Sequence, residues 1–126
     1  MKTKWTFAFA LACSITGNVF GQEKKLNIEM IPITEALFKK GENWGHAFKY
    51  DPRDEELELY DFAISKYEVT QSLYEAVMKT NPSKHKCPEC PVENITYYEA
   101  LDFITELNKL TGHNYRLPSM TEWEYA

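Results

Sequence analysis

The N-terminal 21 residues constrain the fold of this chain most, because they predict a segment that is removed before the protein folds. Two lysines precede an apolar run from Trp5 to Ala12, and the small residue Gly21 stands before Gln22. A basic start, an apolar centre and a small residue are typical of a secretory signal peptide. The apolar run is shorter than the about 20 residues of a transmembrane helix. The sequence therefore predicts a signal peptide at residues 1–21 and an exported domain at residues 22–126.

Cys13 leaves a second route of export open. It follows Ala10-Leu11-Ala12, a pattern related to the bacterial lipoprotein signal, in which an acylated cysteine becomes the new N-terminus. The alternatives are therefore cleavage after Gly21 and a lipid anchor at Cys13. Both predict an extracytoplasmic protein that is periplasmic, secreted or held at the cell surface.

Composition favours one compact domain. The chain has 126 residues, of which 44% are hydrophobic and 14% aromatic, a content that is too high for intrinsic disorder. Its net charge of -5 argues against a nucleic-acid partner, which basic clusters would bind. After Gln22 no apolar run is long enough for a transmembrane span.

The first half of the exported part reads as strands and loops. Alternation of apolar and polar residues predicts an edge strand over residues 26–33, which Pro32 restricts to an edge. A polar loop is predicted at residues 39–58. A second strand is predicted over residues 57–65, with a bulge at Asp61 where the apolar face switches.

The second half carries helix signals. Thr70 is a predicted N-cap, and Asn81-Pro82-Ser83 ends the helix that follows it. Thr96 with Glu99 forms a capping box, and so does Ser119 with Glu122. Gly112 supplies the left-handed end of the longer helix. We expect that helix to bury one face made of Tyr97, Ala100, Leu101, Ile104, Leu107 and Leu110.

Several motifs occur in one order over roughly 65 residues and together resemble a known family. They are Phe62-Ala63-Ile64-Ser65-Lys66-Tyr67-Glu68-Val69-Thr70, Asn81-Pro82-Ser83, Cys90-Pro91-Val92-Glu93, Tyr98-Glu99-Ala100, Leu107-Asn108, Thr111-Gly112, Tyr115-Arg116-Leu117-Pro118 and Glu122-Trp123-Glu124-Tyr125-Ala126. The chain is similar to the formylglycine-generating enzymes, or sulfatase-modifying factors. Motif residues with an expected structural role are Glu68, Thr70, Arg116, Leu117, Pro118, Glu122 and Trp123.

The resemblance implies an irregular α+β fold, related to C-type-lectin-like domains and low in regular secondary structure. Enzymes of this family oxidise a sulfatase cysteine to formylglycine with molecular oxygen. They use a copper-binding cysteine pair, and many hold calcium. The resemblance places these groups after the Glu122–Ala126 motif, so we expect a truncated domain, inactive alone, with no catalytic, metal or cofactor residues in this segment.

Cys87 and Cys90 form a Cys-Pro-Glu-Cys sequence that has several readings. The first is a small disulfide, which suits an oxidising compartment. A redox pair would need a helix after its first cysteine, and Pro91 opposes one. A zinc site would need more ligands than His85 nearby. The copper pair of the family is disfavoured by the position ahead of Pro91. We expect the disulfide.

The remaining polar candidates are expected to be structural. His46 and His113 are predicted loop histidines, because neither has a carboxylate or a nucleophile at a sequence spacing that would indicate a catalytic or metal site. Arg116 is expected to pair with Glu122 or Glu124 rather than to anchor a substrate. The acidic run at residues 51–58 matches no calcium loop and is expected to be solvated.

Three hypotheses for the function follow. The first is an exported member of the formylglycine-generating enzyme family, whose parent activity would act on a sulfatase or another peptide substrate. The second is a non-catalytic surface module that binds or scaffolds, like lipoproteins of gliding motility with the same fold. The third is a remnant without a stable fold, since net stability is only about 5–15 kcal/mol even in intact domains.

Overall fold

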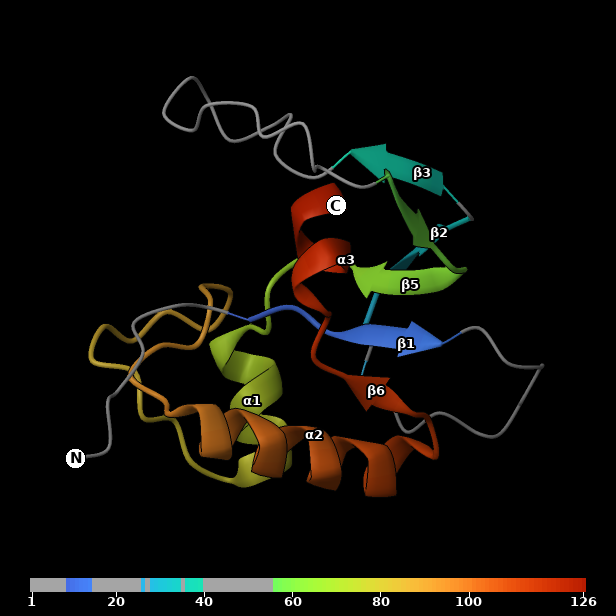
Figure 1. The fold of residues 1–126 in the computed structure, drawn as a ribbon. Helices are drawn as coiled ribbons and strands as arrows, with labels where there is room; N and C mark the ends of the chain where they lie inside the picture. The colour runs from blue at the N-terminus through green and yellow to red at the C-terminus, as the bar shows by residue number, and fades with distance from the viewer. Residues whose placement is uncertain (1–8, 15–25, 27, 35, 40–55) are drawn as a thin grey trace.

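The computed structural model of the chain describes residues 9–14, 26, 28–34, 36–39 and 56–126. Helices and strands both occur, and the strands form small antiparallel sheets (Figure 1). The α+β class is therefore confirmed, whereas the C-type-lectin-like arrangement stays a prediction. The elements are β1 (Ala12–Ser14), β2 (Met30–Ile33), β3 (Ala36–Lys39), β4 (Glu56–Leu59), β5 (Phe62–Ser65), α1 (Gln71–Met78), α2 (Tyr97–Thr111), β6 (Tyr115–Arg116) and α3 (Met120–Tyr125).

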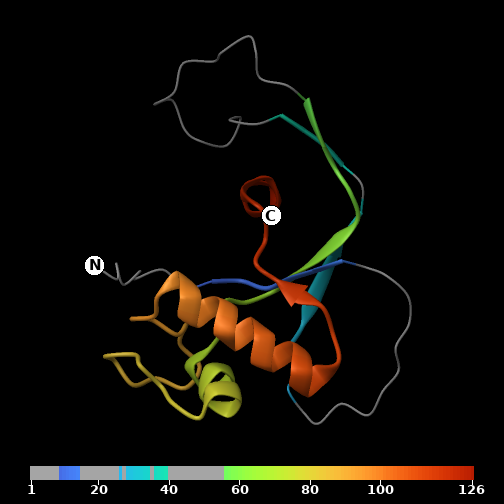
Figure 2. The same ribbon diagram turned by 60° about the horizontal axis from the view of Figure 1, so that its bottom comes forward.

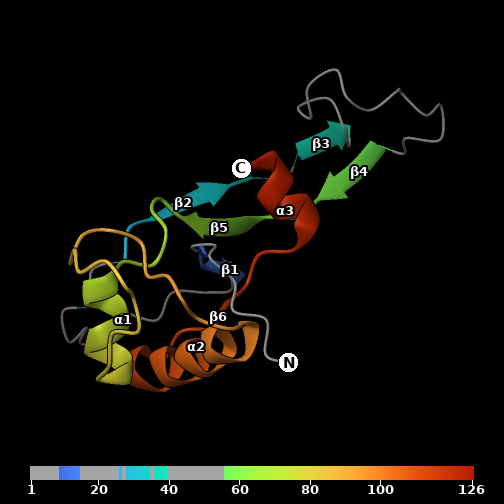
Figure 3. The ribbon, with the colours of Figure 1, turned by 90° about the vertical axis from the view of Figure 1, so that its left-hand side faces the viewer.

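The main sheet has the order β2-β5-β1-β6, so a strand from near the N-terminus lies at its centre. Helices α1 and α2 pack side by side at the β6 end of this sheet, and the two-stranded sheet of β3 and β4 lies at the opposite end (Figures 1 and 3). Figure 2 shows α2 running along the molecule beneath the strands. None of the helices in the described part of the chain is long and apolar enough to cross a membrane.

The three helices begin, and α2 ends, where the local sequence signals predict, whereas α1 already ends at Met78, before the predicted stop at Asn81. The side chains of Thr70, Thr96 and Ser119 each accept a hydrogen bond from the backbone N–H three residues later, at 3.2 Å in all three cases. The capping boxes at the starts of α2 and α3 are complete. Gly112 ends α2 with a φ of 74°, a left-handed conformation that glycine adopts at little cost.

Among the described residues the hydrophobic core has two parts, on either side of the main sheet's centre. The larger part joins α1 and α2 to Leu11, and its side chains include Val69, Tyr74, Val77, Val92, Ile95, Ala100, Phe103, Ile104 and Leu107. The smaller part comprises Ala10, Ala12, Phe62 and Ile64, with Ile33 against it. Residues from the predicted leader therefore contact both parts of the core.

The strand predictions are only partly correct. The single strand predicted over 57–65 is wrong, because β4 and β5 belong to different sheets and Tyr60–Asp61 separate them. The predicted edge strand over 26–33 is present at the sheet edge but is regular only from Met30. The polar loop predicted at 39–58 is wrong at its ends, which belong to β3 and β4. These pairings join residues far apart in sequence, which periodicity does not report.

The buried face of α2 is rotated from the predicted one. Ala100, Ile104 and Leu107 are buried as expected, but Phe103 is the large side chain at the centre of the core, with no exposed surface. The predicted members Tyr97, Leu101 and Leu110 are exposed to 54%, 36% and 58%. Tertiary packing against Tyr74 therefore decides which stripe of this helix is buried.

Candidate functional site

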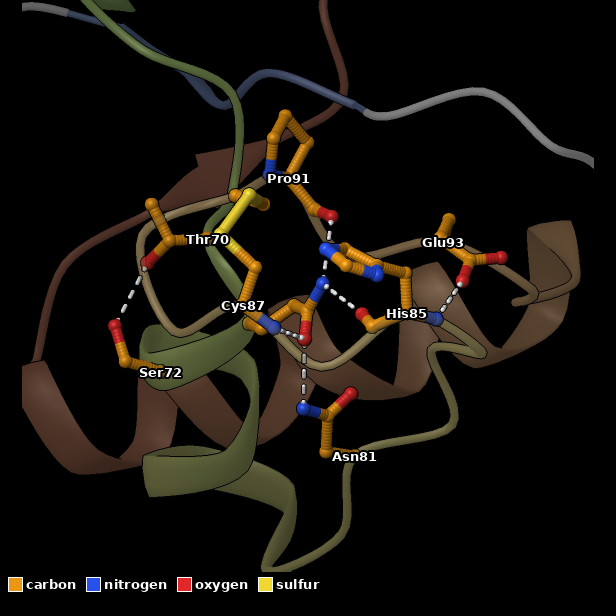
Figure 4. Close-up of a disulfide and its surroundings, with 9 residues drawn as sticks. Thr70, Ser72, Asn81, His85, Cys87, Pro91 and Glu93 are labelled. Carbon is orange, nitrogen blue, oxygen red and sulfur yellow. Dashed lines mark hydrogen bonds between the residues drawn. A yellow bond between two sulfur atoms is a disulfide. The ribbon is translucent and has the colours of Figure 1, made fainter.

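The segment between α1 and α2 is fastened by a disulfide between Cys87 and Cys90 (Figure 4). Their Cα atoms lie 5.2 Å apart, and the backbone N–H of Cys90 donates to the carbonyl of Cys87 at 3.0 Å. Pro91 forms an isolated bridge with Thr70 and does not start a helix. The predicted disulfide is therefore present, in a loop and not at the helix N-terminus that a reactive redox pair requires.

Gln71, which the sequence analysis did not single out, holds this loop against α1. Its side chain is 1% exposed. Its amide nitrogen donates to the carbonyl of His85 at 2.9 Å, and its amide oxygen accepts from Asn81 at 3.0 Å and from the backbone of Cys87 at 3.1 Å. Figure 4 shows these bonds meeting beside the disulfide. A lone glutamine at the first turn of a helix carries no sequence signal for this role.

Glu93 completes the other side of the same loop. Its carboxylate accepts hydrogen bonds from the backbone N–H groups of Lys84 and His85. Figure 4 shows the bond from His85. Its own backbone N–H donates to the hydroxyl of the buried Ser83 at 3.1 Å. Residues of the Asn81–Ser83 and Cys90–Glu93 motifs are thus engaged in holding the loop's shape, and the geometry assigns them no chemistry.

The Tyr115–Pro118 motif supplies a bidentate ion pair. The guanidinium of Arg116 donates to both carboxylate oxygens of Glu122, at 2.5 and 2.7 Å, and Ser119 donates its backbone N–H to the same carboxylate at 2.6 Å. These hydrogen bonds lower the pKa of Glu122 below the usual value of a glutamate, and the bond from Arg116 has the largest effect. The predicted pairing is therefore present, and Glu122 is the partner.

Replacing Glu122 by glutamine is expected to reduce stability by about 1–2 kcal/mol at neutral pH, because a charge-assisted pair with a partly solvated Arg116 is lost. Because the pKa of Glu122 is lowered in the folded state, the wild type is more stable than Glu122→Gln above the unfolded-state pKa of about 4.3. This difference in stability is lost as the pH falls through the folded-state pKa. Urea unfolding of both proteins between pH 7 and pH 2 measures this. We expect the two curves to converge in acid.

Glu106, whose exposed ion pair with Lys109 spans one helical turn, is the matched control. Glu106→Gln is expected to change stability by less than about 0.5 kcal/mol at every pH. If the free energies of unfolding of wild type and Glu122→Gln differ by the same amount from pH 7 down to pH 2, the stabilisation does not depend on ionised Glu122, and the pairing with Arg116 as assigned is contradicted.

The other motif residues have structural positions. Asn108 ties α2 to β6, since its side chain exchanges two hydrogen bonds with the backbone of Tyr115, at 2.8 and 2.9 Å. Leu117 packs at the margin of the larger core. Pro118 is half-buried between β6 and α3, and Trp123 on α3 is 49% exposed.

A cleft of about 360 Å³ lies where β5 ends and α1 begins. Leu26, Ile28 and Leu73 contribute apolar surface, and carboxylates come from three separate segments, namely Glu29, Glu68 and Glu89. Lys66 forms an ion pair with Glu29, in which Nζ lies 2.9 Å from Oε1. The hydrogen bond to Glu29 raises the pKa of Lys66. The cleft can make apolar and electrostatic contacts, but the described residues of its lining include no cysteine or histidine.

The other titratable candidates are scattered. His113 lies edge-on to Tyr115 with ring centroids 5.5 Å apart, and His85 is exposed. His46 and residues 51–55 of the acidic run lie outside the described residues. Cys13 is unpaired and half-buried in β1. Among residues that the structure describes, no three His, Cys, Asp or Glu side chains lie close enough to hold a metal ion.

Comparison with known proteins defines the class. Residues 16–126 match the family profile of the sulfatase-modifying factor enzyme 1-like domain, and the chain belongs to this family. It is similar to the chaperone protein LppX of Paenibacillus barcinonensis, with 29% identity over 148 aligned residues that cover 91% of this chain and 49% of the relative. The chain thus spans about half the length of this curated relative. No solved structure matches the chain significantly.

Proposed function

We propose that this chain is an exported member of the sulfatase-modifying factor family that acts on another exported polypeptide. The family match over residues 16–126 carries the proposal. The Cys87–Cys90 disulfide supports export, because structural disulfides persist outside the reducing cytosol. The signal-like sequence before Gln22 supports it independently. N-terminal sequencing of protein secreted by a bacterial host tests export, with Gln22 as the expected first residue and acylated Cys13 as the lipoprotein alternative.

The parent activity that we infer from the family is oxidation of a sulfatase cysteine to formylglycine. The copper that this activity uses does not fit the described residues, because Cys87 and Cys90 are bonded to each other and Cys13 stands alone. No described carboxylate cluster suits calcium either. We therefore assign no step of the oxidation to these residues. Their part is to form the framework of the fold.

A second candidate is a non-catalytic role in binding or assisting another protein, on the cell surface or in the periplasm. The observation that favours it is the similarity to LppX, which is named a chaperone protein. The exposed cleft between β5 and α1, with its apolar surface and carboxylates, is the described surface best suited to a polypeptide with basic and apolar side chains.

One experiment separates these functions. A cysteine-type sulfatase is refolded with the purified 126-residue chain, copper and oxygen, and both aldehyde formation and the yield of soluble sulfatase are measured. We expect no aldehyde and an increased soluble yield relative to an equal concentration of albumin. Aldehyde would overturn the inactivity of this segment. No effect on either quantity would contradict action on a sulfatase polypeptide.

A further inference from the structure

The cleft at the junction of β5 and α1 carries negative charge that the described part of the chain does not compensate. Glu29, Glu68 and Glu89 line it, and its described lining includes no lysine or arginine. Lys66 pairs with Glu29 from outside this lining. Glu68 and Glu89 are exposed, and neither forms an ion pair with another described residue. The cleft therefore attracts a cation and repels anionic ligands.

Both of these glutamates stand on backbone that is held in place. On either side of Glu89, the carbonyls of Pro88 and Cys90 accept hydrogen bonds from the first turn of α1, each at 2.9 Å. The disulfide closes the same loop. Next to Glu68, Val69 is 1% exposed, and its backbone N–H and carbonyl are both hydrogen-bonded at 2.9 Å. A site whose walls are already fixed loses less entropy when it binds a ligand.

Apolar surface lies in the same cleft as the carboxylates. Leu26, Ile28 and Leu73 are half-buried in its lining, and Ala76 of α1 is exposed there. The side chain of Tyr67 is 66% exposed and also lines the cleft. Tyrosine is enriched among the residues that dominate binding at protein interfaces, and complementary charges add specificity. The lining is thus able to hold a ligand that is both apolar and cationic.

Volume and charge define the class of ligand. About 360 Å³ lies at the lower end of the range for ligand cavities, enough for a few side chains of an extended segment and too little for a folded domain. No three described His, Cys, Asp or Glu side chains lie close enough to hold a metal ion. The glutamates and the net charge of -5 disfavour an anionic lipid surface. A polypeptide segment with a lysine or arginine beside large apolar side chains fits all of these features.

We propose that this cleft binds a short extended segment of another polypeptide, with a cationic side chain facing Glu68 and Glu89 and apolar neighbours against Leu73 and Tyr67. The cation neutralises two carboxylates that no described residue neutralises, and its neighbours remove apolar surface from water. The proposal deepens the second candidate function, in which the chain binds or assists another protein, and it rests on that function.

Binding of a fluorescent nine-residue peptide to the 126-residue chain tests the cleft. The peptide carries one lysine between two leucines, and serine and glycine occupy its other positions. We expect fluorescence anisotropy to show saturable binding that weakens about 10-fold when glutamine replaces the lysine, and about 10-fold when glycine replaces both leucines. Raising the salt concentration from about 0.05 M to about 0.5 M should weaken binding of the lysine peptide and leave that of the glutamine peptide unchanged.

Variants of the chain test whether the peptide lies in this cleft. Glu68→Gln and Glu89→Gln are each expected to weaken binding of the lysine peptide by about 2- to 5-fold, and the double variant by about 10-fold. Glu75→Gln changes an exposed glutamate of α1 outside the lining and should bind like wild type. Circular dichroism and the urea midpoint of each variant should match those of the wild type, because all three side chains are exposed.

Several outcomes would overturn the proposal. Equal affinity for the lysine and glutamine peptides is one, and wild-type binding by the folded double variant is another. Tighter binding of a peptide with glutamate in place of lysine, or of vesicles that contain anionic lipid, would show the opposite charge preference. A dimer of the chain that the lysine peptide dissociates would make a second copy the occupant, and not another polypeptide.

The sulfatase refolding assay separates this proposal from the function on which it rests. If the Glu68→Gln/Glu89→Gln chain raises the soluble yield of sulfatase as much as the wild type does, the function stands and the cleft is not the binding site. If the lysine peptide binds as expected and the wild-type chain leaves the yield unchanged, the cleft is a peptide site whose partner is not the sulfatase.

Discussion

Replacing Phe103 by alanine is expected to lower the free energy of unfolding by about 3–5 kcal/mol, a large part of the stability of a domain of this size. The ring has no exposed surface. It stacks on Tyr74 with centroids 5.2 Å apart and meets Phe9 edge-on at 5.6 Å. Truncation therefore leaves a cavity between α1, α2 and the N-terminal segment, and it removes two aromatic contacts. Urea unfolding followed by circular dichroism measures the change.

Leu110→Ala on the same helix is the matched control. Leu110 is 58% exposed, so its truncation is expected to change stability by less than about 0.5 kcal/mol. Phe103→Leu keeps part of the side-chain volume, so its loss in free energy of unfolding should lie between those of Phe103→Ala and Leu110→Ala. A cost below about 1 kcal/mol for Phe103→Ala would contradict the packing of α2 against α1.

Local signals explain which parts of the fold the sequence predicts. A cap acts within three or four residues, so the starts of α1, α2 and α3 at Thr70, Thr96 and Ser119 can be read directly from the residues. The rotation of α2 about its axis depends on Tyr74, more than 20 positions away in sequence, and the apolar pattern alone misses Phe103. Propensity sets where a helix begins, whereas packing sets which face is buried.

The strands depend still more on distant partners. Phe62–Ser65 was expected to continue from residues 57–59, yet its neighbours are Met30–Ile33 and Ala12–Ser14. Two-residue β6 has no periodicity to detect, and the pairing of Asn108 with the Tyr115 backbone holds it in place. A sequence scanned in windows contains no record of such pairings.

In the candidate site, too, contacts between residues close in sequence were predicted and contacts to distant backbone groups were not. Arg116 was expected to pair with Glu122 or Glu124, and Cys87 with Cys90; both pairs join residues that are close in sequence. Gln71 was missed, because its partners are carbonyl and N–H groups of the loop, which every residue carries and no motif marks. Side-chain to backbone contacts of this kind emerge only when the loop is folded around them.

Gln71→Leu is expected to destabilise the protein by about 2–5 kcal/mol. Leucine is close to glutamine in volume, so the change removes hydrogen bonds with little effect on packing. The carbonyl of His85, the side chain of Asn81 and the backbone N–H of Cys87 lose their bonds to Gln71 in a part-buried loop. Each unpaired group costs about 1–3 kcal/mol where water cannot replace the partner. The expected result is a lower urea midpoint and faster hydrogen exchange at the Cys87 amide.

The exchange measurement distinguishes this role from a general loss of stability. Glu75→Ala, on the exposed side of the same helix, should leave both the midpoint and the exchange at Cys87 within error. Gln71→Glu keeps the accepting oxygens but cannot donate to His85, so it should retain more protection at Cys87 than Gln71→Leu does. If Gln71→Leu unfolds at the wild-type midpoint with an unchanged Cys87 amide, the disulfide and the neighbouring backbone bonds, from Gln71 to Cys90 and from Ser72 to Pro88, suffice to hold the loop. The buried glutamine would then contribute nothing measurable to the loop's position.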